Sequence, residues 1–237
     1  MALHFVASPP IFKLITMTPS PRIALIHATR VAIEPVETAA ASLWPEAETI
    51  SILEEGLSVD RSKAAELSKE LSDRIKALSH YAQAAHADGI LFTCSAFGTA
   101  IAQANAQTDI PVMNPNEAMF DAALSQGERI AMIYTFQPAA AGMEEEFRET
   151  AAARGSAAQI TSYFCEGALD AKRSGDDDRH DQLIAQTAAE IEGADVILLA
   201  QFSMAGAAEA VRSAVAIPVL TSPESAIREI RRRIETK

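Results

Sequence analysis

The sequence predicts an α/β fold with two pseudo-symmetric lobes, each a parallel sheet with helices on both faces, and an active-site cleft between the lobes. Apolar strand-like runs alternate with helical patterns, which is typical of parallel sheets. Three segments also recur at one offset of 107 residues, as between Arg22 and Arg129: residues 22–27 at 129–134, 87–91 at 194–198, and 110–112 at 217–219. This spacing indicates that the chain holds two copies of one unit.

The length supports this division, because 237 residues accommodate two lobes of roughly 110 residues each. We expect an N-terminal extension at 1–20, a first lobe at 21–127 and a second lobe at 128–237, whose final helix returns to pack on the first lobe. The extension lies outside the repeat. It is either a leader preceding a natural start at Met17 or an arm that packs on the second lobe or on a partner subunit.

The strands of the first lobe are expected at 22–27, 48–53 and 89–93, with a fourth ending at Val112. Helices are expected between them at 33–44, 61–86 and 95–106, with another at 116–126. The second lobe repeats this order: strands at 129–134, 158–164, 195–200 and 217–220, and helices at about 138–153, 178–192, 204–214 and 223–236. In such sheets, ligands bind outside the carboxyl ends of the strands.

Composition excludes several classes of partner. The net charge of −12 argues against a nucleic-acid or anionic-membrane surface. No apolar run approaches the roughly 18 residues that a membrane helix needs. Two cysteines without a signal peptide predict a reducing, cytoplasmic location and no disulfide framework.

One strand end carries the clearest candidate for chemistry. The apolar run at 89–92 ends in Thr93 and Cys94, and small residues and a helical pattern follow. A cysteine facing a helix N-terminus has a lowered thiol pKa, which makes it a proton carrier or a nucleophile. The alternative is a small buried hydrophobic residue, because free cysteines are often buried.

Under the 107-residue offset, Gln201 of the second lobe corresponds to Cys94, so one thiol is predicted to face one amide. Neither a metal-ligand spacing, a P-loop nor a G-x-G-x-x-G motif is present, so we expect no metal and no nucleotide cofactor. Other strand-end candidates for substrate binding supply an imidazole, hydroxyls, an amide and small or aromatic side chains: His27, Thr93, Ser95, Ala96, Asn114, Tyr134, Thr135, Phe202 and Ser203.

Residues 22–235 resemble the aspartate/glutamate/hydantoin racemase superfamily. The resemblance depends on the repeat and on two motifs, Asp-Gly-Ile-Leu-Phe-Thr-Cys-Ser-Ala at 88–96 and Asp-Val-Ile-Leu-Leu-Ala-Gln-Phe-Ser-Met at 195–204. In that superfamily each lobe supplies a cysteine beside a carbon next to a carboxylate or carbonyl. One thiolate removes the proton, and the other thiol returns it from the opposite face without a cofactor. The resemblance implies a small carboxylate or related acidic substrate and a homodimer or higher homo-oligomer.

The resemblance also assigns roles by position. Cys94 corresponds to the first catalytic cysteine. His27 takes the place of an Asn or Asp that touches the substrate in relatives. Ser95 and Ala96 take the place of the donors that hold a carboxylate, and Thr135 that of a carboxylate-binding threonine.

Gln201 departs from the pattern, because an amide does not exchange a proton near neutral pH. The second acid–base group is then Tyr134 or His27, if either points into the cleft. The alternative for His27 is a ring held by a backbone carbonyl. Ser203 lies nearby without a base in the sequence to activate it. Cys165, which follows the strand at 158–164, is a weaker candidate for a replacement thiol.

These observations predict a cofactor-independent, racemase-like isomerase in which a single cleft thiol transfers a proton next to a carboxylate or carbonyl. One alternative is a decarboxylase of the arylmalonate type with one-sided protonation, although those enzymes keep the second-lobe cysteine. Maleate isomerases use the first-lobe cysteine as a nucleophile, but they also have the second. Another alternative is a ligand-binding protein on the same scaffold without catalysis.

Overall fold

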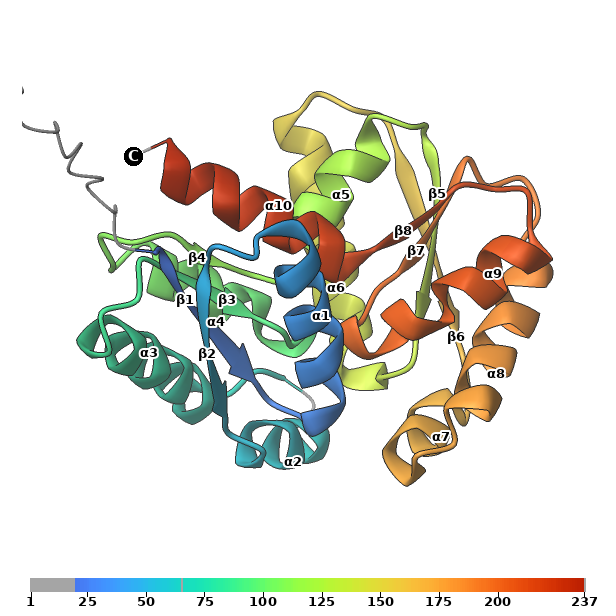
Figure 1. The fold of residues 1–237 in the computed structure, drawn as a ribbon. Helices are drawn as coiled ribbons and strands as arrows, with labels where there is room; N and C mark the ends of the chain where they lie inside the picture. Colours follow the sequence, from blue (N-terminus) through green and yellow to red (C-terminus); the bar gives the residue numbers. More distant parts are fainter. Residues whose placement is uncertain (1–19, 65, 237) are drawn as a thin grey trace, which may run out of the picture.

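The computed structural model of the protein describes residues 20–64 and 66–236, which form two four-stranded parallel sheets surrounded by helices (Figure 1). The strand orders are β2-β1-β3-β4 and β6-β5-β7-β8. The predicted two-lobed α/β fold is confirmed. The alternatives for the N-terminal extension concern residues almost entirely outside the described ranges.

The sheets repeat one another in both order and register. Ile23 pairs with Gly89 in the first sheet, and their counterparts Ile130 and Val196 pair in the second. The central strands are continuous apolar runs buried on both faces, whereas β2 and β6 at the edges are partly exposed. The strands are β1 (Arg22–His27), β2 (Glu48–Leu53), β3 (Gly89–Phe92), β4 (Val112–Met113), β5 (Arg129–Tyr134), β6 (Gln159–Phe164), β7 (Val196–Leu199) and β8 (Val219–Thr221).

Helices connect the strands on both faces of each sheet (Figure 1). In the first lobe they are α1 (Ile33–Leu43), α2 (Gly56–Lys63), α3 (Lys69–Ala84), α4 (Gly98–Asn105) and α5 (Glu117–Leu124). In the second they are α6 (Ala140–Ala153), α7 (Ala168–Ser174), α8 (Asp177–Ala189), α9 (Ala208–Ala214) and α10 (Ser222–Glu235).

The prediction of one helix over 61–86 was wrong, because α2 and α3 are separate. The chain is extended at Ala64, and Ser68 then caps α3 by accepting a hydrogen bond from the Leu71 N–H at 3.2 Å. Asp60 lies inside α2 and pairs with Arg74 of α3 at 2.7 Å. Helix α7, which follows Gly167 in a left-handed conformation, was not predicted either.

Short 3-10 turns follow the four central strands and form the loops at their carboxyl ends. They are η1 (Arg30–Ala32), η2 (Ser95–Phe97), η3 (Gln137–Ala139) and η4 (Phe202–Ala207). The α-helix after β3 therefore begins only at Gly98, four residues beyond Cys94.

Both lobes contribute to one apolar core. Phe92 of β3 and Leu198 of β7 belong to a single buried cluster with α5 and α6. Within it the rings of Phe120 and Phe147 pack edge to face, with centroids 5.5 Å apart. The positions of the two sheets are thus coupled by buried side chains.

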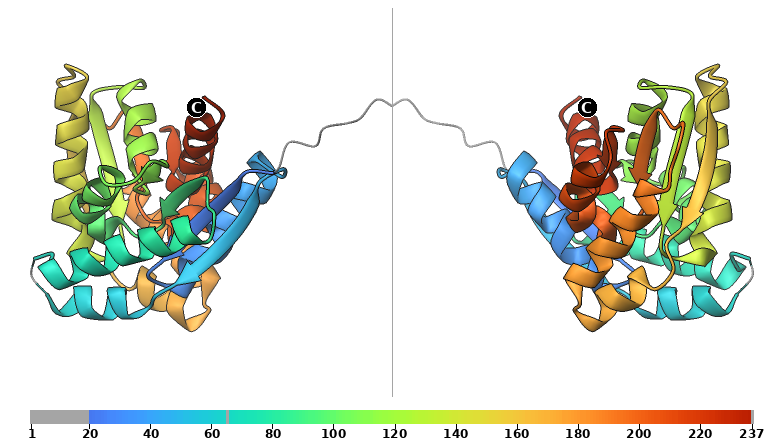
Figure 2. Two further views of the ribbon diagram at one scale, coloured as in Figure 1. Left: turned by 90° about the vertical axis from the view of Figure 1, so that its left-hand side faces the viewer. Right: turned by 90° about the vertical axis from the view of Figure 1, so that its right-hand side faces the viewer.

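The final helix α10 packs against the first lobe, beside α1 (Figure 2). Ile227 and Ile230 are buried in a cluster with residues of β1 and α1. Arg231 donates to the Leu43 carbonyl at 3.0 Å, and its guanidinium lies 5.6 Å from the centre of the Trp44 ring.

Asp195 holds the start of the second lobe, directly after the junction with the first. Its carboxylate accepts the backbone N–H groups of Glu128 and Arg129 at 3.0 and 2.9 Å and pairs with the Arg129 guanidinium. These contacts hold the carboxyl pKa well below its usual range. Gly127 packs directly on Asp195, since a Cβ there would lie 2.3 Å from the Asp195 Cβ.

We therefore expect Gly127→Ala to lower the free energy of unfolding by ~1–3 kcal/mol, as overpacking does. Gly142→Ala is the matched control. It lies in α6 with no atom within 4 Å of a new methyl group, so the change should be neutral or stabilising by up to ~1 kcal/mol. Urea unfolding measures both, and equal effects would contradict this packing.

Candidate active site

The carboxyl ends of β3 and β7 meet at a cavity of about 40 Å³ between the lobes. It is small, with room for a few water molecules. Its lining combines hydroxyls, one thiol, one amide and apolar side chains: Thr29, Val31, Ala32, Ser58, Thr93, Cys94, Ser95, Thr135, Phe136, Leu169, Arg173, Gln201, Phe202 and Ser203.

Cys94 and Gln201 thus line the same cavity, together with five of the predicted substrate-binding residues: Thr93, Ser95, Thr135, Phe202 and Ser203. Ala96 and Asn114 line a neighbouring hollow, which shares Ser95 with the cavity. His27 lies behind Thr93, and the Tyr134 ring packs against Phe164 with centroids 5.4 Å apart. The structure does not bring these last four residues to the cavity wall.

The Cys94 thiol is protonated at neutral pH. Burial raises its pKa to about 11, while a backbone hydrogen bond from Ala96 and the charge of Arg61 act in the opposite direction. The expectation of a lowered pKa was wrong, because burial dominates and because a 3-10 turn separates Cys94 from the start of α4. In the free protein the Cys94 thiol is therefore mainly protonated, and its abundant form can donate a proton but cannot accept one.

Arg61 is a buried cation that joins the two lobes behind η2. Its guanidinium donates to the carbonyls of Ala96 at 3.2 Å, Ala64 at 2.7 Å and Pro138 at 2.9 Å, the last in the second lobe. Within the described ranges no carboxylate pairs with Arg61, so its charge remains available to stabilise an anion at the cavity.

Gln201 is held with its amide nitrogen free. Its Oε1 accepts hydrogen bonds from the Thr135 N–H at 2.9 Å and the Thr135 hydroxyl at 3.3 Å. Because a backbone N–H can only donate, this contact fixes which end of the amide is oxygen. The Nε2 atom is buried and has no partner among the described residues. Gln201 therefore offers a buried donor that a ligand oxygen would satisfy.

The remaining wall is largely apolar, with Val31, Phe136, Leu169 and Phe202. Arg173 is the charged residue of the lining, and its side chain is exposed. A more open hollow of about 440 Å³ adjoins the cavity and shares Thr29, Val31, Ser58, Phe136 and Arg173 with it.

Sequence reasoning missed part of this wall. Ser58 comes from the first turn of α2, before the predicted helix at 61–86, and Leu169 and Arg173 come from α7, which was not predicted. Figure 1 shows both helices at the end of the molecule to which the arrows of β1 and β5 point. Thr29 and Phe136 carried a usable signal, because each lies two residues beyond the end of a predicted strand.

Neither candidate for a second acid–base group titrates near neutrality at this wall. Burial lowers the pKa of His27 to about 4, against an opposing effect of Glu37, so the ring is neutral. Burial, assisted by Glu144, raises the pKa of the Tyr134 phenol. Cys165 is buried in a separate cluster with Ile184 and does not line the cavity, and burial raises its thiol pKa.

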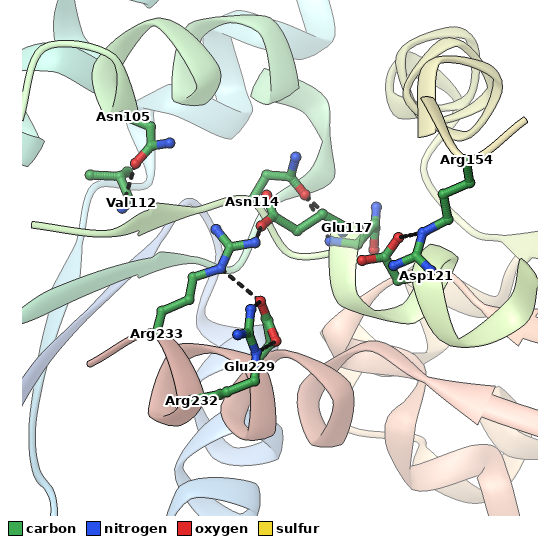
Figure 3. Close-up of polar contacts among 10 residues, drawn as sticks. Asn105, Val112, Asn114, Glu117, Asp121, Arg154, Glu229, Arg232 and Arg233 are labelled. Carbon is green, nitrogen blue, oxygen red and sulfur yellow. Dashed lines mark hydrogen bonds and ion pairs between the residues drawn. The ribbon is translucent and has the colours of Figure 1, made fainter. Parts of the chain in front are cut away.

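The hollow that holds Asn114 measures about 430 Å³ and also contacts Glu146. Asn114 Oδ1 accepts the backbone N–H groups of Asn116 and Glu117 at 3.0 Å, at the start of α5 (Figure 3). Arg233 pairs with Glu117 and with Glu229. Glu146 Oε1 has no partner in the described part of the chain, and burial together with Glu117 raises its pKa to about 8.

Residues 20–64 and 66–236 contain no group of three or more His, Cys, Asp or Glu side chains arranged to hold a metal ion. None of the helices in those ranges is long and apolar enough to cross a membrane.

The fold and the strand-end cavity define a two-lobed α/β protein of the racemase type. The sequence model of the Asp/Glu/Hydantoin racemase family matches residues 34–230, and the chain belongs to that family. A search of curated protein sequences found no match.

Solved structures with the same fold include three relatives of different activity. A glutamate racemase isoform from Bacillus anthracis is 12% identical, with a TM-score of 0.73 over 92% of this chain and 83% of that one. An allantoin racemase from Pseudomonas fluorescens is 15% identical, with a TM-score of 0.68 over 91% of each chain. A mutant arylmalonate decarboxylase is 14% identical, with a TM-score of 0.62 over 91% of this chain and 94% of that one.

The raised thiol pKa predicts slow alkylation of Cys94. In a Cys165→Ala background, the rate with iodoacetamide should rise about tenfold per pH unit from pH 7 to 9, because only the thiolate reacts. A Cys94→Ser variant of the same background is the control and should not react. A rate that rises only about threefold or less between pH 8 and 9 would show an ordinary or lowered thiol pKa.

The raised pKa of Glu146 predicts that the protein loses stability as the pH rises. Its folded-state pKa of about 8 exceeds the ordinary 4.5, so the protein loses stability as pH rises through this window, and the loss is complete above pH 8. Glu146→Gln should therefore raise the free energy of unfolding by ~1–3 kcal/mol at pH 9, allowing for solvent screening, and leave it unchanged at pH 4. The exposed Glu209→Gln is the control, and equal behaviour of both variants would refute this.

Proposed function

We propose that the protein is a cofactor-independent enzyme that transfers a proton at the carbon next to a carboxylate or carbonyl of a small molecule, using Cys94 alone. The observation that supports this most is the pairing across one cavity of a thiol with an amide whose nitrogen is free. A thiol moves a proton, whereas a neutral amide donates a hydrogen bond and keeps its proton.

The chemistry divides between the two walls. The Cys94 thiolate takes the proton from one face of the carbon, and the electron pair moves toward the adjacent oxygen as an enolate. The Gln201 Nε2 group donates to that oxygen, and the Arg61 charge stabilises the developing anion. The Cys94 S–H group, after exchange with solvent, then returns a proton from the same side, either to the original carbon as hydrogen exchange or to another atom of the enolate as isomerisation.

Among the described residues, the second lobe places no acid–base group at the cavity for the opposite face. Its cavity residues Thr135, Gln201 and Ser203 offer hydroxyls and an amide, and no described base contacts Ser203. Proton transfer is therefore expected on one face, and symmetric inversion through two thiols is absent.

A decarboxylation is the second candidate, because the thiol is protonated and the wall is apolar. With a thiol pKa of about 11, roughly one thiol in 10⁴ is ionised at pH 7, so the acid is the abundant form. A substrate with two carboxylates on one carbon would release CO₂, leaving the bonding electron pair as an enolate. Cys94 would protonate that carbon, and water would restore the thiol. An apolar wall disfavours a carboxylate relative to neutral CO₂.

The test is a panel of acids in D₂O at neutral pH. Aspartate, glutamate, allantoin and an arylmalonate represent the compounds in the names of the family and of the structural relatives. NMR should detect deuterium on the carbon next to the carboxylate or carbonyl, with CO₂ release for the decarboxylase. Cys94→Ser should lower the rate at least about 100-fold, whereas Cys165→Ala should leave it unchanged. A rate of deuterium incorporation that Cys94→Ser leaves unchanged would reject the proposal. Binding of an acid without deuterium incorporation or CO₂ release would also reject it and would favour a ligand-binding protein.

Gln201→Cys should restore a proton carrier to the second lobe. We expect this variant to interconvert the two enantiomers of the substrate, which chiral chromatography measures. Gln201→Ala is the control, because it removes the amide without adding a thiol and should only reduce the exchange rate. Equal behaviour of the two variants would show that the second wall does not face the reacting carbon.

A further inference from the structure

A chain of four polar side chains runs from the surface of the first lobe to the cavity wall. Glu37 is exposed on α1, and its Oε1 lies 2.6 Å from the Ser51 hydroxyl on β2. The Ser51 oxygen lies 3.3 Å from Nε2 of His27, which is fully buried at the end of β1. His27 Nδ1 lies 2.9 Å from the hydroxyl of Thr93, which lines the cavity.

The chemistry of the groups fixes the direction of this chain. An ionised Glu37 accepts only, so the single proton of Ser51 points to Glu37. The Ser51 oxygen must then accept from His27 Nε2–H. A neutral imidazole carries one N–H, which leaves Nδ1 as the acceptor for the Thr93 hydroxyl. Every donor therefore points outward, from Thr93 to Glu37.

We propose that His27 is a positioning residue that acts on the cavity through Thr93, with its tautomer set from the surface by Glu37 through Ser51. His27 does not line the cavity, so it does not itself touch a ligand there. Its ring instead accepts the hydrogen bond that the Thr93 hydroxyl donates, so that this proton is not available to a ligand. The other acceptor near that hydroxyl, the Ile26 carbonyl, is more distant at 3.4 Å.

Two consequences follow for the site. A ligand group that reaches the Thr93 oxygen meets lone pairs, so the matching group is a hydrogen-bond donor, N–H or O–H. Thr93 also directly precedes Cys94, so the chain restrains the backbone that carries the thiol. Only this second consequence depends on the proposed function, because the tautomer is a property of the free protein.

Nitrogen-15 NMR of the His27 ring tests the direction of the chain. The wild-type ring should carry its proton on Nε2. Glu37→Leu frees the Ser51 proton to point at Nε2, so the ratio of the Nε2–H to the Nδ1–H tautomer should fall about fivefold, the effect of one hydrogen bond. Glu34→Leu, an exposed glutamate on the same helix, should leave the ratio unchanged. A wild-type proton on Nδ1, or an unchanged ratio in Glu37→Leu, would overturn the proposal.

The positioning role is tested by steady-state kinetics with an acid from the panel that incorporates deuterium. His27→Leu should lower kcat up to about tenfold with little change in KM, while His27→Asn, whose Oδ1 can accept from Thr93, should recover most of it. Equal losses in both variants would overturn the role. If His27→Leu does not fold, Ser51→Ala replaces it, with the same expected loss. If no acid exchanges, the proposed function fails while the NMR result still decides the direction of the chain.

Discussion

The positions of the opposed ends of β3 and β7 depend on a single apolar core that both sheets share. Ile90 of β3 and Val196 of β7 lie in the same buried cluster as Phe120 and Phe147 of α5 and α6. Such an interior is close-packed and resists small displacements. Arg61 adds a polar link, because its guanidinium reaches carbonyls of both lobes. The cavity between the strand ends is therefore positioned by buried contacts on either side of it.

Duplication makes the backbone symmetric and leaves the chemistry asymmetric. Cys94 and Gln201 occupy equivalent strand ends, yet one carries an exchangeable thiol proton and the other a fixed donor. Thr135 holds Gln201 through its N–H and hydroxyl, while the equivalent position in the first lobe is Ala28, which has no hydroxyl. The first lobe instead supports its strand end through His27 and Thr93. Each wall thus has its own set of polar supports.

Much of the fold could be predicted from the sequence, because apolar runs indicate the strands and the constant offset shows that the same succession of elements occurs twice along the chain. The register of Ile23 with Gly89 and of Ile130 with Val196 follows the same offset. The break between α2 and α3 was missed, since it depends on one serine cap within a continuous helical pattern. The parts of the cavity wall that come from Ser58 of α2 and from α7 were missed for other reasons: α2 begins before the predicted helix at 61–86, and α7 follows a left-handed glycine, Gly167.

The direction of the Cys94 pKa shift could not be predicted from the sequence either. Proximity of a helix N-terminus to a cysteine is visible in a motif, whereas the burial that outweighs it depends on side chains from both lobes. Asn114 shows a similar limit. Its place at a strand end was correct, but its amide oxygen caps the start of α5 and it lines the neighbouring hollow.

The central claim is that proton transfer occurs on one face only. Its most direct test is the configuration of the product formed in D₂O from a prochiral substrate, or of the substrate recovered after exchange. The account predicts a single labelled enantiomer, because Cys94 is the one thiol at the wall of the cavity among the described residues. A labelled product that is racemic from the earliest turnovers would contradict it.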